Sequence, residues 1–462
     1  MEKMSTTKLD YRRTVLVGFA FMSICSFWQL YNFVIPLILK HTFHVNDMVS
    51  GAVMAADNVL ALFMLPLFGK LSDKTSTKIG KRTPYILFGT LASVILMTVI
   101  PIVDWNVTRI NNGGTASFGS AHFNFIIFFA ALGLLLIAMS TYRSPAVALM
   151  PDVTPKPLRS KGNAVINLMG ALGGIFAYGI IAVAAPKVEN IDAVTGFGTK
   201  SGSYFNLFAI IGGFMAAAAI VLLCTVNENK LVALMPHDED ESAKGESQEE
   251  KAASADKLPR DVRTSLIFIL LSVALWYIAY NGVETAYSRF AIDEWGISEG
   301  TASTMMIIAM LVATVSYIPV GMISAKIGRK KVIIGGVIIM GLAFLAACFM
   351  NSYSWIAYVI MCVIGVGWAS INVNSYPMVV EMSKGSDVGR YTGYYYAFSM
   401  AAQIITPILS GALFSLMGSY DVLFPYAVFF TALALVTMLF VRHGDSIPEK
   451  TSDALELFDV ED

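Results

Sequence analysis

The chain has 462 residues, of which 56% are apolar and only 14% are charged. A soluble chain carries about 25% charged residues, so this composition excludes an ordinary soluble domain. The net charge of −1 gives no overall attraction to nucleic acid, and no nucleic-acid partner is expected. With a mean hydropathy of +0.65, most of the surface is expected to face a lipid bilayer.

Long apolar segments recur along nearly the whole chain. A transmembrane helix needs roughly 20 mostly apolar residues to cross about 30 Å of hydrocarbon. The pattern predicts twelve such helices, at about 14–39, 48–70, 84–104, 122–150, 163–185, 204–226, 264–290, 300–325, 331–350, 354–380, 391–417 and 421–441. The first segment follows basic residues, as in a signal peptide. It is too long for one and lacks a small-residue cleavage site, so we expect it to be retained.

The distribution of basic residues predicts the orientation of the chain. An even number of spans places both termini on one side of the membrane. The opposite loops hold only four of the 32 Lys and Arg residues, namely Lys40, Arg109, Lys187 and Lys200. By the positive-inside rule, this predicts an integral protein of the cell membrane with both termini in the cytoplasm.

A polar stretch, Asn227 to Arg263, separates the sixth and seventh segments. It is rich in acidic residues, and its acidic core has no aromatic residue, so it cannot bury enough apolar surface to fold. We interpret it as a disordered cytoplasmic linker. The predicted domains are a six-helix unit at 1–226, the linker at 227–263, a second six-helix unit at 264–442 and a cytoplasmic tail at 443–462.

The two halves carry matching motifs in the same order. Trp-Gln-Leu-Tyr-Asn at 28–32 is echoed by Trp-Tyr-Ile-Ala-Tyr-Asn at 276–281. Gly69 opens a Gly-x-x-x-Asp-Lys loop after segment two, and Gly321 opens Gly-x-x-x-Ala-Lys after segment eight. Arg159 and Arg390 each begin Arg-x-x-Gly at segments five and eleven. Together these matches predict a duplicated six-helix unit, with a binding site between the copies near mid-membrane.

The loop motifs resemble the cytoplasmic loop motif of the major facilitator superfamily. The run from Pro66 to Pro84 is similar to that of the glycoside–pentoside–hexuronide:cation symporters and the related sucrose:proton symporters. Tyr142-Arg143-Ser-Pro-Ala resembles the Arg-bearing fourth helix of the sucrose carriers. The resemblance implies an all-α membrane protein of twelve transmembrane helices, with two six-helix bundles around a central cavity. It also implies symport of a disaccharide-like sugar or glycoside by alternating access.

Two departures from these groups concern the coupling ion. Melibiose-type sodium carriers have two acids one turn apart in helix two, whereas this chain has Asp57 and, a turn later, Ala61. Plant sucrose carriers have an acid in helix four upstream of the Arg, whereas residues 130–139 here contain none. A sodium site needs several oxygen ligands and a proton needs one titratable group, so the single acid favours a proton.

Four ionisable residues inside the predicted spans are candidates for function, because burying a charge in the membrane is costly. Asp57 and Arg143 both fall near mid-membrane by residue count. Asp57 is the candidate proton carrier, and the planar fork of Arg143 suits sugar hydroxyls or a carboxylate. Glu284 lies one turn after Asn281 and is a second candidate for proton coupling. Arg289, nearer the outer end, can reach the interface with its charge.

Amides and flat aromatic side chains cluster at similar depths on several helices. A sugar offers many hydroxyls and an apolar ring face, so such a set suits it. The alternative is that these groups serve helix–helix hydrogen bonding and interfacial aromatic belts. The predicted substrate-binding residues, with Arg143, are Gln29, Asn32, Trp276, Tyr280, Asn281, Trp368, Asn372 and Tyr395.

Charged residues and glycines in the cytoplasmic loops are the candidates for conformational gating. In the superfamily that the chain resembles, such residues hold the cytoplasmic helix ends together when the carrier is open outward. The predicted gating residues are Gly69, Asp73, Lys81, Arg82, Asp152, Arg159, Arg329, Lys330, Glu381 and Arg390.

Other functional classes find little support in the sequence. It lacks a Walker motif, which argues against an ATP-driven pump, and has no Cys/His cluster with metal-ligand spacing. We therefore expect no enzyme activity, no cofactor, no metal and a monomer that binds a small solute and protons. The alternatives are an exporter of drugs or other metabolites on the same fold, and a non-transporting membrane receptor.

Overall fold

The computed structural model describes residues 9–115, 117–155, 158–189, 198–234, 259–382 and 388–445. Within these residues, eleven helices are long and apolar enough to cross a membrane, and α14 is a shorter apolar helix of 17 residues. The all-α prediction with twelve segments is confirmed. The helices of the first half are α1 (Tyr11–His41), α2 (Asp47–Lys74), α3 (Thr83–Asn111), α4 (Ala121–Asp152), α5 (Arg159–Ala184) and α6 (Phe205–Thr225). Those of the second half are α9 (Arg260–Asp293), α10 (Glu299–Ile327), α11 (Arg329–Cys348), α12 (Ile356–Val380), α13 (Val388–Met417) and α14 (Leu423–Leu439).

Three short elements lie outside these helices. Strands β1 (Val188–Glu189) and β2 (Thr199–Lys200) pair antiparallel between α5 and α6. Helix α7 (Glu228–Ala233) follows α6 and corrects the prediction of disorder from residue 227 onwards. Most of the predicted linker (235–258) and of the predicted tail (446–462) lies outside the described residues, and the domain boundaries stay a prediction.

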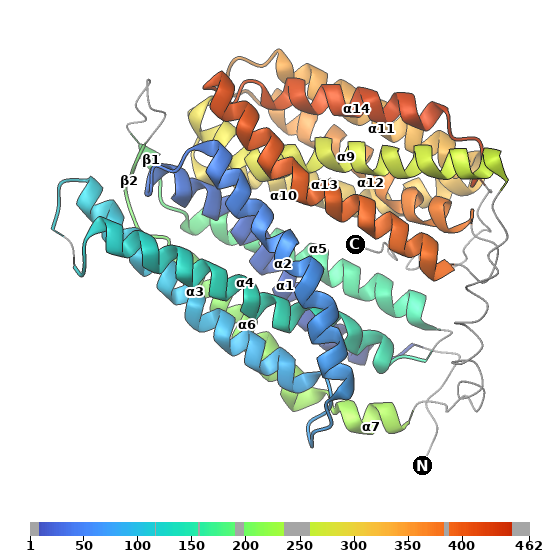
Figure 1. Ribbon diagram of the computed structural model, residues 1–462, viewed down its shortest axis with the longest axis horizontal. Coiled ribbons are helices and arrows are strands. Elements are labelled where there is room, and N and C mark those ends of the chain that lie inside the picture. The colour runs from blue at the N-terminus through green and yellow to red at the C-terminus, as the bar shows by residue number, and fades with distance from the viewer. Residues whose placement is uncertain are drawn as a thin grey trace.

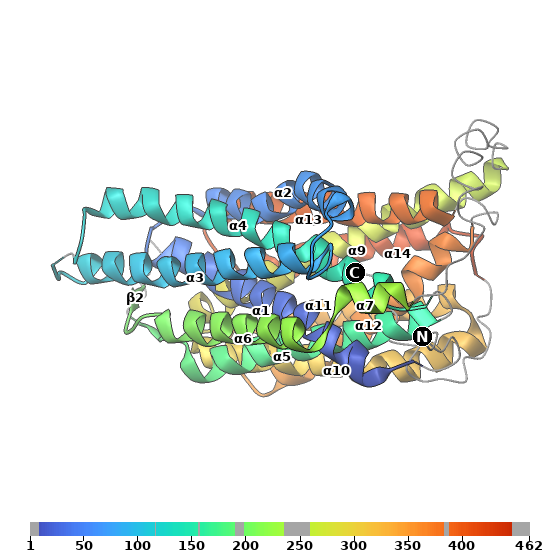
Figure 2. The same ribbon diagram turned by 90° about the horizontal axis from the view of Figure 1, so that it is seen from below.

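The helices form two bundles, α1–α6 and α9–α14, shown in blue to green and in yellow to red (Figure 1). Two helix pairs make most of the contact between them: α2 packs on α13, and α5 packs on α10. The view from below shows these pairs on opposite sides of the molecule (Figure 2). Large apolar side chains such as Phe63, Phe88 and Leu91 are exposed on the outer surface, as expected for a surface covered by lipid.

We call the end of the molecule where α1 ends and α2 begins the closed end, because the bundles meet there. Some helices that start at this end, among them α2 and α10, have side-chain caps: Asn46 accepts a hydrogen bond from the Val49 backbone N–H at 2.8 Å. Ser298 likewise accepts from the Thr301 N–H at 3.2 Å. Such caps satisfy N–H groups that have no partner within the helix, so the helix starts are fixed where the bundles touch.

Small residues allow the two backbones to approach closely at the closed end. A Cβ atom added at Gly51 of α2 would lie 2.0 Å from the Pro407 carbonyl oxygen of α13. A Cβ at Gly411 would lie 2.3 Å from the Asp47 carbonyl oxygen. Only glycine fits in such packing, so these two positions let the bundles close.

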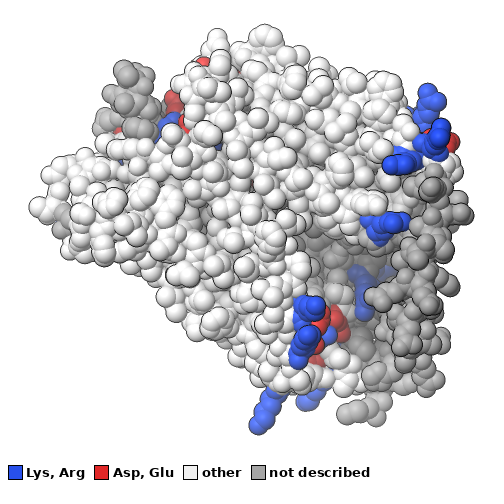
Figure 3. Space-filling model, viewed as in Figure 1, with Lys and Arg blue, Asp and Glu red and all other residues white. Residues whose placement is uncertain are grey.

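At the opposite end, which we call the linker end, the bundles diverge (Figure 1). This end holds the start of α1, helix α7 and the start of α9. The space-filling view shows the surface hollowed between the bundles at this end, with Lys and Arg side chains nearby (Figure 3). The molecule is therefore closed at one end and open at the other.

Candidate functional site

The two central ionisable residues predicted from the sequence lie near each other in the first bundle. Asp57 of α2 and Arg143 of α4 are both partly buried and interact electrostatically. In the part of the chain that the structure describes, no ion pair of 4.0 Å or less joins them. The Asp57 carboxylate instead accepts a 3.1 Å hydrogen bond from the side chain of Asn58. The two charges are coupled but not in contact.

Arg143 lies against an aromatic side chain that the sequence did not single out as a site residue. Its guanidinium carbon is 5.7 Å from the centre of the Trp28 ring on α1, a cation–π contact. The buried Nε1 of Trp28 has no hydrogen-bond partner among the described residues. The Arg143 fork likewise donates no hydrogen bond to any of them. Because buried polar groups are normally satisfied, these donors are available to a bound solute.

A second group of polar side chains connects the two bundles toward the closed end. The Tyr178 hydroxyl of α5 donates a 2.7 Å hydrogen bond to the Gln29 amide oxygen of α1. The Ser303 hydroxyl of α10 donates to the Tyr178 carbonyl at 2.5 Å, and the charge of Glu284 on α9 acts on Tyr178. Gln29 and Glu284 are thus brought together by Tyr178, which the sequence analysis missed because nothing marked it within an apolar helix.

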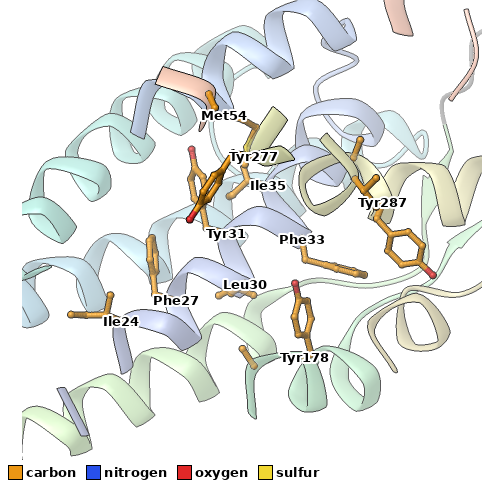
Figure 4. Close-up of a cluster of buried hydrophobic side chains, with 14 of the residues drawn as sticks. Ile24, Phe27, Leu30, Tyr31, Phe33, Ile35, Met54, Tyr178, Tyr277 and Tyr287 are labelled. Atoms are coloured by element: carbon orange, nitrogen blue, oxygen red, sulfur yellow. The ribbon is translucent and has the colours of Figure 1, made fainter. Parts of the chain in front are cut away.

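Aromatic rings form the wall contributed by the second bundle. Tyr280 of α9 stacks on Trp368 of α12 with ring centres 3.8 Å apart and planes 9° from parallel. Tyr277 meets the same Trp368 edge-on at 5.4 Å. Asn281, next to Tyr280, has a buried side-chain nitrogen without a hydrogen-bond partner among the described residues. Close-up views place Tyr277 and Tyr31 among the buried side chains between α1 and α9 (Figure 4).

Three residues predicted to bind substrate lie inside the second bundle. Trp276 has no exposed surface. Tyr395 is 1% exposed, and its hydroxyl shares a 2.9 Å hydrogen bond with Ser375. Asn372 is buried and lies 3.5 Å from the Tyr317 hydroxyl. The expectation that these side chains face a solute is not supported in this conformation, because protein atoms already surround them. Asn32 is partly buried on α1.

The predicted gating residues of the first bundle form a network at the linker end. Arg82, just before α3, pairs with Asp73 and donates to Asp152 of α4 at 2.9 Å. It also donates to the carbonyl oxygen of Gly69 at 3.2 Å. Lys81 pairs with Asp152 at 3.1 Å. All these contacts lie within the first bundle.

The second bundle repeats this arrangement at the matching place. Arg329, at the start of α11, pairs with Glu381 at the end of α12. Elsewhere at this end, Arg159 donates to the Thr154 carbonyl at 3.4 Å within the first bundle, and Arg390 is exposed at the start of α13. Since these contacts do not cross between the bundles, a role in holding the bundles together stays a prediction.

Two carboxylates that the sequence analysis missed complete these networks. Glu228 of α7, 1% exposed, accepts hydrogen bonds of 2.9–3.1 Å from the backbone N–H groups of residues 81–83 at the start of α3. Asp445, after α14, accepts from the Lys330 N–H at 2.8 Å at the start of α11. A carboxylate at a helix start satisfies free donors and complements the helix dipole. The contact made by Glu228 fixes α7, the short helix after α6, against the start of α3.

The closed end carries ionic contacts between the bundles. Arg289 of α9 pairs with Asp47 of α2 at 2.9 Å, which corrects the interpretation that its charge reaches the interface. Lys40 of α1 pairs with Asp293 of α9. A charged residue expected only to mark topology, Lys40, thus takes part in closing this end.

Comparison with known proteins identifies the family of this architecture. The sequence profile described as Major Facilitator Superfamily matches residues 17–293 and 269–458. The chain belongs to the major facilitator superfamily. Solved structures share the fold: a POT family transporter in complex with 5-aminolevulinic acid has a TM-score of 0.66 at 12% identity, over 96% of this chain and 97% of its own. A bacterial homologue of the iron transporter ferroportin, in an inward-facing state, has a TM-score of 0.65 at 11% identity, over 94% and 99%.

Two characterised proteins are similar in sequence to part of this chain. Lactose permease of Lactobacillus helveticus is 25% identical over 192 residues, which is 40% of this chain and 28% of the permease. Sucrose transport protein SUC3 of Arabidopsis thaliana is 26% identical over 168 residues, 36% of this chain and 27% of the relative. The matches thus span little more than a quarter of each relative. Membership of the superfamily places the protein among membrane transporters.

Proposed function

We propose that the protein carries a sugar or glycoside across the cell membrane together with a proton, by alternating access. The observation that carries this proposal is the Arg143 guanidinium, which lies over the Trp28 ring, acts on Asp57 and donates no hydrogen bond to the described residues. A guanidinium offers several donors in a fixed plane, and an indole face suits the apolar face of a sugar ring. The partial similarity to a lactose permease and a sucrose transport protein supports the same substrate class.

The second bundle supplies the other side of the proposed site. The Tyr280–Trp368 stack offers a rigid aromatic surface, and the side-chain nitrogen of Asn281 has no hydrogen-bond partner among the described residues. Gln29, paired with Tyr178, and Asn32 add amides from α1. Ligand sites of this kind combine apolar walls with a few placed polar groups. A solute that binds between the bundles would be released at whichever end is open.

Asp57 is the proposed proton carrier, and Glu284 is the second candidate. A buried carboxylate without an ion pair favours its neutral form, because desolvation penalises the charge. When Asp57 is neutral, Arg143 is left without a nearby negative charge and is free to bind solute. When the proton leaves, Asp57 competes for Arg143 and solute is released. Binding of proton and sugar would thereby be coupled.

The substrate role of Arg143 gives a direct prediction. Arg143→Lys keeps the positive charge but loses the planar fork, and hydrogen bonds to charged groups are worth about 1.5–3 kcal/mol. We expect solute affinity to fall about tenfold or more, measured as displacement of a labelled sugar from purified protein. A panel of mono- and disaccharides would first identify the ligand.

The matched control is Arg109→Lys, which changes an exposed arginine whose guanidinium contacts Ser117 outside the proposed site. It should bind the sugar as the unmodified protein does. Equal affinity in Arg143→Lys and Arg109→Lys would remove Arg143 from the site. A panel in which drugs bind and sugars do not would favour an exporter instead.

The proposed orientation places the linker end in the cytoplasm and the closed end outside. Both termini and residues 227–263 would then be protected in sealed right-side-out vesicles. Protease added to such vesicles should leave the chain uncut between the bundles, and cleavage should occur once the vesicles are opened. Cleavage at this segment in intact vesicles would reverse the orientation.

A further inference from the structure

A buried carboxylate at the closed end is not used in the proposed transport cycle. Glu299 is the first residue of α10 and is 1% exposed. The Tyr204 hydroxyl, from the other bundle, donates a 2.6 Å hydrogen bond to its Oε1. Its Oε2 has no hydrogen-bond partner among the described residues. The contact between Tyr204 and Glu299 crosses the boundary that must open when the closed end opens.

The charges that act on Glu299 come from the first bundle. They are Lys200 of β2 and Asp104 of α3, which form an ion pair with each other. Asp104 also accepts a 2.7 Å hydrogen bond from the Thr42 hydroxyl. Burial raises the pKa of Tyr204 well above its usual value, so its hydroxyl stays a neutral donor. Helix α5, packed against α10, presents the Ala182 backbone at this level, beside Gly300.

With all three side chains charged, Asp104, Glu299 and Lys200 would have a net charge of −1. Asp104 and Glu299 provide two carboxylates, whereas Lys200 is one ammonium and already pairs with Asp104. Burial lowers the pKa of Lys200, and the adjacent Asp104 opposes that effect, so this ammonium depends on Asp104 for its charge. Among the described residues of the first bundle, no other charge that acts on Glu299 remains to balance it. An unpaired buried charge is costly enough that the group is neutralised instead.

The rest of the closed end does not supply the missing positive charge. Lys40 pairs with Asp293, and Arg289 pairs with Asp47. Each of these positive charges is therefore already matched by a carboxylate. His41 lies 3.4 Å from Asp293, but its Nδ1 accepts a 3.0 Å hydrogen bond from the Gly198 N–H. Both contacts hold the His41 ring against partners other than Glu299.

We propose that closing this end takes up one proton at Glu299, so that acidity favours the closed state. When the bundles part, Glu299 moves away with α10 and meets water as a carboxylate. The Asp104–Lys200 pair stays balanced within the first bundle. When this end closes, the Glu299 carboxylate is buried near the Asp104–Lys200 pair with no positive charge left to balance it. Binding of a proton to Glu299 removes the excess negative charge. This proton is distinct from the one proposed at Asp57, since it is bound and released at the same face.

The test is the distance between the bundles at the closed end as a function of pH. Spin labels at His122→Cys and Ser352→Cys, in a protein whose native cysteines are replaced, report this distance by pulsed electron resonance in nanodiscs. The background carries Asp57→Asn, so that titration of Asp57 cannot contribute. Linkage of one proton allows the ratio of closed to open protein to rise up to about tenfold per unit fall in pH.

Three variants decide the outcome. Glu299→Gln keeps an acceptor for Tyr204 without a charge and should remove the pH dependence, with the closed state retained at high pH. Asp104→Asn frees Lys200 to balance Glu299 and should move the transition to lower pH. Glu189→Gln changes an exposed carboxylate at the same end and should leave the curve unchanged. An unchanged curve in Glu299→Gln, or a flat curve in the background protein, would overturn the proposal.

Discussion

Asp57→Asn is expected to abolish proton-driven accumulation of solute. The substitution keeps the size of the side chain and removes the titratable group, so a transport cycle can no longer bind and release a proton there. With one proton per solute, a gradient of one pH unit can support about tenfold accumulation. We expect this ratio to fall to one in proteoliposomes with an imposed pH gradient, while exchange of solute down its own gradient continues.

Control experiments distinguish a loss of proton coupling from misfolding, and they distinguish coupling to protons from coupling to sodium. Asn58→Ala removes the hydrogen bond to Asp57 but keeps the carboxylate, and should still accumulate solute. Accumulation by Asp57→Asn would assign the proton to another group, with Glu284→Gln as the next variant. Uptake that follows a sodium gradient and ignores pH would contradict proton coupling altogether.

Gly51→Leu is expected to stop transport in every mode. An added Cβ would lie 2.0 Å from the backbone oxygen of Pro407, and a backbone atom cannot move aside as a flexible side chain can. The bundles could then not meet at the closed end, and the protein would stay open there. Since both net uptake and exchange require this end to close, we expect each to fall to roughly a hundredth or less. That loss corresponds to a closing penalty of about 2.7 kcal/mol.

Solute binding distinguishes this effect from misfolding. Gly51→Leu should still bind solute in detergent, because Gly51 lies outside the proposed site. The control Gly213→Leu places the same side chain on α6, where an added Cβ meets nothing within 4 Å, and should transport normally. Normal exchange by Gly51→Leu would show that this end need not close as tightly as the structure has it.

The sequence was sufficient to predict the elements and the repeat. Apolar segments of membrane-spanning length predicted the helices, and residue counts placed Asp57 and Arg143 at similar depth before the structure brought them together. The shared loop motifs predicted a duplicated unit, and in the structure the Arg82–Asp152 and Arg329–Glu381 pairs occupy corresponding positions.

The direction in which each side chain points could not be predicted in the same way. Trp28 and Trp276 belong to matching motifs, yet Trp28 contacts Arg143 and Trp276 is fully buried. A helix that meets lipid on one side and protein on the other is apolar all round, so periodicity does not reveal its inner face. Nor did the sequence indicate that the charges of Lys200 and Glu299, far apart along the chain, would act on each other.

The caps provided by Glu228 and Asp445 determine whether the two halves of the chain can be produced as separate fragments. Each carboxylate follows the last helix of its own bundle and fixes the start of a helix in that same bundle. Neither cap requires a residue of the other bundle. A gene cut between the codons for residues 234 and 259 would therefore encode two fragments that each contain their own caps. Such fragments should be able to fold separately and reassemble in one membrane.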